Sequence, residues 1–372
     1  MVNFKRIAAF VLLFCILLTA FPAYAEDGSW VSAEAAVLYC PDNGQFLYEK
    51  NADRFMLIAS LTKIMTAVVV LENCKTSDVV CVDSRAVGIE GSSAYLSAGE
   101  KLTVLDLLYA LLLESANDAA VALALHTSGS IEKFADLMNE KAAELGLAAS
   151  RFANPHGLDA EEHGSSARDL ALLCGYALKN KTFKRITSTK SIRIDDGGGE
   201  NTHFLINHNR MLSIYDGAIG VKTGYTKASG RCLVSSAERD GVTVIAVTLN
   251  APGDWNDHKV MLDYAFTVLH RVTLPSEETT FDVSVMAGTA SCVKAKAAPC
   301  DFVFDQNVFP DGGSVYMSKF YYAPVKAGDV LGRIEYKCGG EVVAAVPIVA
   351  QTESDAVVYK RKFFDKILEF FR

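Results

Sequence analysis

The sequence lacks several features that would point to other classes of protein. It has no C-x-x-C pair and no Cys/His group at metal-ligand spacing, so a zinc site is disfavoured. It has no internal repeat and no low-complexity segment. It also lacks an excess of basic residues, since its formal net charge is −8. A nucleic-acid partner is therefore disfavoured, because binding to phosphates needs a positive surface.

The N-terminus has a short apolar stretch between basic and small residues. Residues 7–20 are apolar, follow Lys5 and Arg6, and precede Ala23 and Ala25. This pattern predicts a signal peptide over residues 1–25, because the apolar stretch is too short for a comfortable membrane span. An uncleaved anchor is the alternative. Cleavage would remove two basic residues and no acidic ones, changing the net charge from −8 to −10.

Eight cysteines follow the predicted signal peptide, an even number that permits disulfides in an exported chain. Their density is too low for a disulfide scaffold, so we expect most of them to be buried thiols, with disulfide bridges as the alternative. They are Cys40, Cys74, Cys81, Cys174, Cys232, Cys292, Cys300 and Cys338.

The C-terminal segment 360–372, KRKFFDKILEFFR, predicts an amphipathic helix. Phe364, Ile367, Leu368 and Phe371 share one helical face, and the segment has a net charge of +3. A basic face beside an aromatic face is typical of a helix lying in a membrane surface. A terminal helix packed on its own domain is the alternative.

The residues between the two ends predict a mixed fold. Segments 35–40 and 45–50 read as strands around the turn PDNG, residues 58–180 are apolar at helical period, and strands return over 217–250. A helix is expected over 256–271. We expect one antiparallel sheet with helices packed on it. After Pro275, short alternating strands up to residue 351 predict a small all-β domain.

Ser60 and Lys63 form an S-x-x-K pair where a helix begins. The spacing alone is weak evidence, because Ser130/Lys133 and Ser291/Lys294 repeat it. Ser60 could be an ordinary N-cap. If it lies just inside the helix, Lys63 shares its face and could take its proton.

Two further polar motifs favour the second interpretation. Ser115 and Asn117 form an S-x-N motif that interrupts two apolar helical segments, where polar groups are costly to bury without partners. Lys222, Thr223 and Gly224 form a K-T-G motif near the end of a strand, where a glycine lets another chain approach closely. A loop between core helices and a solvated strand edge are the respective alternatives.

S-x-x-K, S-x-N and K-T-G in this order match the set found in class A β-lactamases and penicillin-binding proteins. The run from Ser29 to Arg271, with GSSAYLSAGEKLTV, SANDAAVALA, NPHGLDAEEHGSSARDLALL and GVKTGYTKASGRCLVSSAERDG, resembles the low-molecular-mass penicillin-binding D-alanyl-D-alanine carboxypeptidases. The resemblance implies an α/β (α+β) catalytic domain over 26–274 with an antiparallel sheet and a helical subdomain, a small β-sandwich-like domain over 275–352, and an amphipathic membrane-surface helix over 353–372.

The resemblance also implies a serine peptidase that removes the last D-alanine from peptidoglycan stem peptides. Ser60 would form the acyl-enzyme, Lys63 would act as its base, and Ser115 would pass a proton to the leaving amine. Burial and the cation of Lys222 would favour the neutral form of Lys63. No cofactor is expected, and β-lactam antibiotics should acylate Ser60.

The remaining motif residues would hold the substrate. Asn117 would bind its backbone, Lys222 and Thr223 its terminal carboxylate, and the backbone N–H groups of Ser60 and Tyr225 would form the oxyanion hole. Gly224 completes the predicted substrate-binding residues. The enzyme would work on the cell-wall side of the cytoplasmic membrane.

Two other functions remain open at this point. A serine β-lactamase would need an additional acidic residue, and the region with Asp159, Glu161 and Glu162 lacks the E-x-x-L-N pattern. A non-catalytic wall-binding protein would keep the cleft without the chemistry. His156 and His163 are expected to have surface or capping roles.

Overall fold

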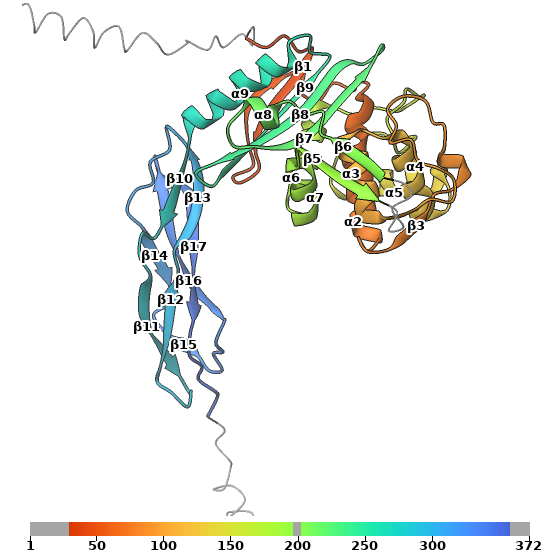
Figure 1. Cartoon of the computed structure of the whole chain (residues 1–372). Helices are drawn as coiled ribbons and strands as arrows, with labels where there is room; N and C mark the ends of the chain where they lie inside the picture. The colour runs from red at the N-terminus through yellow and green to blue at the C-terminus, as the bar shows by residue number, and fades with distance from the viewer. Residues whose placement is uncertain (1–29, 196–201, 358–372) are drawn as a thin grey trace, which may run out of the picture. The chain divides into compact units, whose positions relative to one another are not determined.

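The computed structural model describes residues 30–195 and 202–357 (Figure 1). It contains two compact units. The first runs up to Glu238 and includes Thr243–Ala265, and the second comprises Arg239–Val242 and the chain from Phe266 onward. The boundary between the units lies at 265/266, and the segment Leu269–Leu274 beyond it is a strand that pairs within the second unit.

A five-stranded sheet organises the first unit, with the order β2-β1-β9-β8-β7. β1 pairs antiparallel with β2 and with β9, and β7 pairs antiparallel with β8, as expected from the sequence. The strands are β1 (Ala35–Cys40), β2 (Gln45–Lys50), β7 (Ala218–Thr226), β8 (Gly230–Arg239) and β9 (Val242–Leu249). Strand β7 is an edge of this sheet.

Helices and two short hairpins complete the first unit. A capping box of Thr103 and Asp106 starts helix α3, which is buried along nearly its whole length and packs against α4 and α2. The helical elements are η1 (Ala59–Thr62), α2 (Lys63–Asn73), η2 (Ser84–Ala86), α3 (Val104–Leu113), α4 (Asn117–Ser128), α5 (Ile131–Glu144), α6 (Ala167–Leu178), α7 (Lys181–Ser188), α8 (Met211–Ile214) and α9 (Asp254–Val268). The hairpins are β3 (Val79–Cys81) with β4 (Lys101–Thr103), and β5 (Ser191–Asp195) with β6 (Thr202–Ile206).

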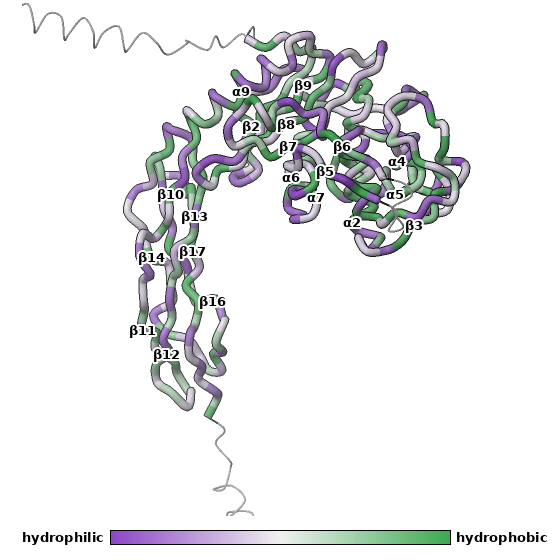
Figure 2. The backbone as a smooth tube through the Cα atoms, viewed as in Figure 1, coloured by the Kyte–Doolittle hydropathy of each residue, from purple (hydrophilic) through white to green (hydrophobic). Residues whose placement is uncertain are grey.

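The second unit is built from strands. A six-stranded sheet has the order β14-β16-β17-β12-β11-β15, and β10 (Leu269–Leu274) pairs with β13 (Cys300–Asp305). The six strands are β11 (Thr279–Met286), β12 (Cys292–Ala297), β14 (Ser314–Met317), β15 (Tyr321–Tyr322), β16 (Val330–Cys338) and β17 (Glu341–Ala350). Buried and exposed positions alternate along β11 and β12, and their hydropathy can be followed in Figure 2. The all-β domain is therefore confirmed.

The two predicted terminal segments are mostly outside the described residues. The signal peptide, 1–25, lies wholly outside them. Of the predicted helix 353–372, residues 353–357 are described and are extended instead, with bridges from Ser354 to Val325 and from Ala356 to Gly288. No described helix is long and apolar enough to cross a membrane.

The eight cysteines after the predicted signal peptide are free thiols. Cys40, Cys174 and Cys232 are buried, whereas Cys81 and Cys292 are exposed. They are free thiols as predicted, but only three of the eight are buried, so the prediction that most of them are buried is wrong.

Candidate active site

Ser60 lies in the short 3₁₀ turn η1, directly before α2. Neither η1 nor α2 has a side-chain cap, so the N-cap interpretation is wrong. Lys63 is the first residue of α2, and its Nζ lies 2.9 Å from Ser60 Oγ. The residue before the serine, Ala59, has a φ of 47°, which turns the chain sharply at this point.

The other two S-x-x-K pairs have structural roles. Ser130 is the N-cap of α5, where its hydroxyl accepts a hydrogen bond from Lys133 N. Lys294 lies on β12 in the second unit and forms an ion pair with Asp282. Of the three pairs, only Ser60/Lys63 has its lysine amine within hydrogen-bond distance of its serine hydroxyl.

Lys63 is fully buried and makes two further contacts besides Ser60. Its Nζ lies 2.7 Å from Asn117 Oδ1 and 2.6 Å from the backbone oxygen of His156. Burial lowers the pKa of Lys63 well below its ordinary value, and the nearby Lys222 cation lowers it further, while Asp118 acts in the opposite direction. The neutral amine is favoured in this environment.

The side-chain amide of Asn117 has a defined orientation. Its Nδ2 donates to the carbonyl of Glu90 at 2.5 Å, so its Oδ1 faces Lys63. The next residue, Asp118, is buried and accepts hydrogen bonds from the Ser93 hydroxyl and from two backbone N–H groups of segment 94–96. Asp118 thereby holds the loop that supplies the Glu90 carbonyl.

Ser115 and Lys222 come from different elements of the first unit. Ser115 lies in the bend between α3 and α4, with a φ of 61°. Lys222, on β7, is buried, and its Nζ donates to the carbonyl of Thr223 at 2.9 Å. Burial lowers the pKa of Lys222 to about 7, and the carboxylate of Glu114 opposes this change.

Gly224 allows β7 to lie directly against the serine turn. A Cβ at this position would be 3.0 Å from the Ile58 oxygen and 3.2 Å from Ser60 N. Gly157 likewise lets its own segment lie against the serine turn, since a Cβ there would be 2.0 Å from the Ala59 oxygen. The predicted close approach at Gly224 is therefore confirmed.

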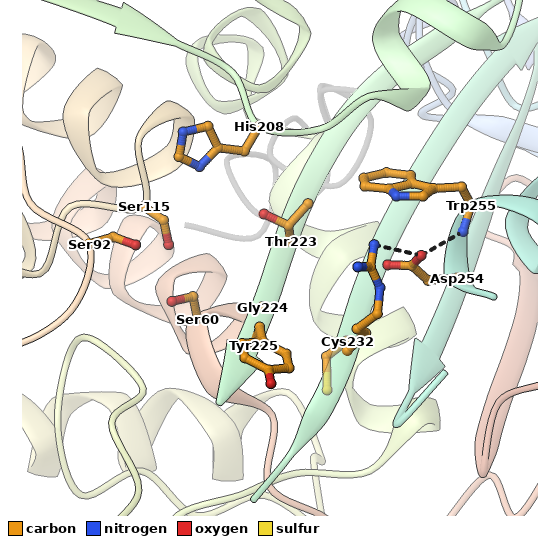
Figure 3. Close-up of a pocket in the computed structure, with 11 residues that line it drawn as sticks. Ser60, Ser92, Ser115, His208, Thr223, Gly224, Tyr225, Cys232, Asp254 and Trp255 are labelled. Carbon is orange, nitrogen blue, oxygen red and sulfur yellow. Dashed lines mark hydrogen bonds and ion pairs between the residues drawn. The ribbon is translucent and has the colours of Figure 1, made fainter. Parts of the chain in front are cut away.

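A cavity of about 290 Å³ opens in front of these groups (Figure 3). Figure 3 shows Ser60 and Ser115 on one side of β7, with Asp254 and Trp255 on the other. The lining residues are Ser60, Ser92, Ser115, His208, Thr223, Gly224, Tyr225, Arg231, Cys232, Asp254 and Trp255. Asn117 and Lys222 are buried and do not line the cavity.

Some parts of the site could not be expected from the three motifs. The backbone oxygens of His156 and Glu90 orient Lys63 and Asn117, and a backbone group has no signature in the sequence. His163 is buried, so of its two expected roles, surface or capping, the surface role is wrong. Arg231 forms an ion pair with Asp254 at 3.0 Å beside the cavity.

The arrangement defines an active-serine enzyme of the penicillin-binding type: an antiparallel sheet borders a helical region, and a serine with a buried amine lies where they meet. Residues 23–253 match the family described as D-alanyl-D-alanine carboxypeptidase, Peptidase S11. Residues 313–356 match the C-terminal domain of penicillin-binding protein 5.

Individual relatives agree with this match. The chain is 35% identical to the D-alanyl-D-alanine carboxypeptidase DacF of Bacillus subtilis, over 94% of each chain. Among solved structures, it resembles a peptidoglycan synthesis regulatory factor (PBP3) of Streptococcus pneumoniae, with a TM-score of 0.73, 26% identity and coverage of 87% of this chain and 100% of the other. Penicillin-binding protein 5 of Haemophilus influenzae gives a TM-score of 0.70, 26% identity and coverage of 87% and 98%.

The chain belongs to the D-alanyl-D-alanine carboxypeptidase family, Peptidase S11, and is a serine-type peptidase. The expected family and fold class are confirmed.

Proposed function

We propose that the chain removes the terminal D-alanine from peptidoglycan stem peptides ending in D-Ala-D-Ala, through an acyl-enzyme on Ser60. The family supports the reaction, and the contacts of Lys63 support the assignment of the nucleophile and its base. The observation that supports it most directly is the buried amine beside the serine hydroxyl.

The hydrogen bonds of Lys63 favour a base rather than an acid. A neutral amine has two N–H donors and one lone pair. Asn117 Oδ1 and the His156 oxygen can only accept hydrogen bonds, so they take the two donors. The lone pair is then left for the third neighbour, the hydroxyl of Ser60, which can donate its proton.

The acylation step follows from this arrangement. Ser60 Oγ forms a bond to the carbonyl carbon of the penultimate D-alanine while its proton passes to Lys63. The C–N bond to the last D-alanine then breaks, and a proton reaches the leaving amine through Ser115, which borders the same cavity. Water then hydrolyses the ester and restores Ser60.

The substrate would be held mainly by β7. Lys222 and Thr223 would bind the terminal carboxylate, and the N–H groups of Ser60 and Tyr225 would bind the developing oxyanion. Gly224 supports the oxyanion hole because it lets the strand and the serine turn approach. Asn117 would contact the substrate backbone, although its amide bonds Lys63 and Glu90 in this structure.

A labelled penicillin tests the assignment of the nucleophile. We expect it to attach covalently to the unmodified protein and to leave the Ser60→Ala variant unlabelled. Mass spectrometry of a pentapeptide substrate should show loss of one D-alanine. Equal labelling of both proteins, or cleavage at another bond, would contradict the proposal.

The ends of the chain fit this function. We retain the signal peptide over residues 1–25 and the membrane-surface segment within 360–372 as proposals from the sequence. Together they would place the catalytic region, proposed as 26–274, and the β-domain, proposed as 275–352, on the cell-wall side of the membrane, where the substrate lies.

A further inference from the structure

The peptide unit between Ala59 and Ser60 is held from its carbonyl side. Thr62 Oγ1 donates a hydrogen bond to the Ala59 oxygen at 2.8 Å, and both residues are buried. A peptide unit is planar, so the Ala59 carbonyl and the Ser60 N–H point in opposite directions. A group that fixes the carbonyl therefore also fixes the direction of the N–H.

The hydroxyl of Thr62 is in turn oriented by His163. The Nδ1 of His163 accepts a hydrogen bond from Ala153 N at 3.0 Å, so the ring proton of the neutral imidazole is on Nε2. Nε2 lies 2.8 Å from Thr62 Oγ1 and donates to it. The Thr62 proton is then free to point at the Ala59 carbonyl.

The environment of His163 keeps this direction of hydrogen bonding. The ring is almost completely buried, and burial lowers the pKa of His163 to about 4, although the carboxylate of Asp159 acts in the opposite direction. A protonated ring would place a second donor against Ala153 N–H, which cannot accept it.

The serine turn needs such a constraint. Ala59 is a non-glycine residue with a φ of 47°, a conformation that persists only when the surrounding structure holds it. Gly157 packs against the same peptide and leaves no room for a Cβ, since that atom would lie 2.0 Å from the Ala59 oxygen and 3.0 Å from Ser60 N. The peptide that bears the Ser60 N–H is thus held by close backbone packing as well as by a chain of hydrogen bonds.

We propose that Thr62 and His163 are positioning residues for the oxyanion hole: the relay from Ala153 N–H through His163 and Thr62 to the Ala59 carbonyl aims the Ser60 N–H at the substrate oxyanion. This inference rests on the proposed function, because it needs an acyl transfer at Ser60. The relay also polarises the peptide, since hydrogen bonds in a chain strengthen one another.

Three variants separate this role from ordinary packing. Thr62→Val keeps the shape of the side chain and removes the hydroxyl, whereas Thr62→Ser keeps the hydroxyl. Thr66→Val is a matched control on the neighbouring turn of α2, because Thr66 is also fully buried and its hydroxyl donates to the Pro155 carbonyl at 2.6 Å. Its other contact, at 3.5 Å, is to the backbone oxygen of Thr62 and does not involve the Thr62 hydroxyl.

The readout is the carbonyl of the acyl-enzyme itself. A penicillin labelled with ¹³C at the β-lactam carbonyl is reacted with each full-length protein, and the infrared stretch of the resulting ester is measured along with the acylation rate constant. A weaker oxyanion hydrogen bond shifts the stretch to higher wavenumber. Thr62→Val should show this shift and roughly tenfold slower acylation, less than the loss of a whole donor. Thr62→Ser and Thr66→Val should keep the stretch of the unmodified protein.

The outcomes separate this inference from the proposed function. If the unmodified protein is not acylated at Ser60, the proposed function fails. If it is acylated but Thr62→Val gives the same stretch as Thr66→Val, the relay is refuted. Should Thr62→Val not fold, His163→Phe removes the donor to Thr62 while keeping a ring, and it should shift the stretch in the same direction; an unchanged stretch in His163→Phe then refutes the relay.

Discussion

Adding one methyl group at Gly224 should separate the two sides of the oxyanion hole. The backbone of Gly224 is not in the left-handed region, so the effect of Gly224→Ala is steric. The new Cβ would meet the Ile58 oxygen at 3.0 Å, Ser60 N at 3.2 Å and the Ala59 Cβ at 3.3 Å. Two of these atoms belong to the backbone and cannot rotate away, so β7 and η1 must move apart by a few tenths of an ångström.

The expected effect is larger on catalysis than on stability. Overpacking a tight contact typically costs about 1–3 kcal/mol in the free energy of unfolding. A displaced oxyanion donor removes transition-state stabilisation, and the loss of one donor costs roughly 100-fold or more in rate. We therefore expect the acylation rate constant with a labelled penicillin to fall about 100-fold, while the protein remains folded at room temperature.

The assay compares Gly224→Ala with Gly312→Ala. At Gly312, no atom lies within 4 Å of the place that a Cβ would take, and the backbone is not left-handed, so its substitution reports the general effect of replacing glycine. Both proteins are measured for thermal unfolding and for acylation at several penicillin concentrations. Acylation by Gly224→Ala within threefold of Gly312→Ala would refute the reasoning.

Three further predictions concern charge and the C-terminus. Below pH 7, Lys222 is charged, and its cation lowers the pKa of Lys63. In a plot of acylation rate constant against pH, Lys222→Met should therefore move the rise on the acid side to higher pH. An unmoved rise would exclude this coupling. Burial lowers the pKa of His258 from 6.5 to about 3. Between pH 6.5 and pH 3 the unfolded chain therefore binds more protons than the folded one. The free energy of unfolding should fall as the pH falls through this range, by at most about 5 kcal/mol. Urea unfolding at several pH values should show that the free energy of unfolding depends less on acid pH in His258→Gln, but not in His126→Gln, where the histidine is exposed. Deleting residues 358–372 should abolish binding to anionic vesicles without changing cleavage of a soluble peptide; full vesicle binding by the truncated chain would disprove the membrane-surface proposal.

The sequence predicted elements well where the local signal is strong. The strands at 35–40 and 45–50 have the expected bounds, because a tight turn separates two short apolar runs. The helix expected over 256–271 ends at Val268 instead, because Leu269–Leu274 pairs with β13, a partner some thirty residues away. Such pairing overrides local helical periodicity.

In the candidate site, too, the features with a local sequence signal were predicted and those that depend on distant backbone groups were not. The three motifs together predicted that Ser60, Lys63, Ser115 and β7 meet in one site, because their combination in this order is distinctive although S-x-x-K alone is not. The carbonyls of His156 and Glu90 were not expected, because any residue could supply them. The roles of the motif residues stay predictions until the variants are measured.

The edge position of β7 has a consequence for solubility. A strand at the margin of a sheet offers unpaired backbone groups that can recruit strands from other molecules and start aggregation. In the described part of the chain, no strand pairs with β7 on its outer side, but η1 packs closely against it and α7 and α8 contact it. These elements pack against β7 and hinder the approach of a second sheet. An edge strand protected in this way can offer its backbone to a substrate peptide without recruiting strands from other molecules.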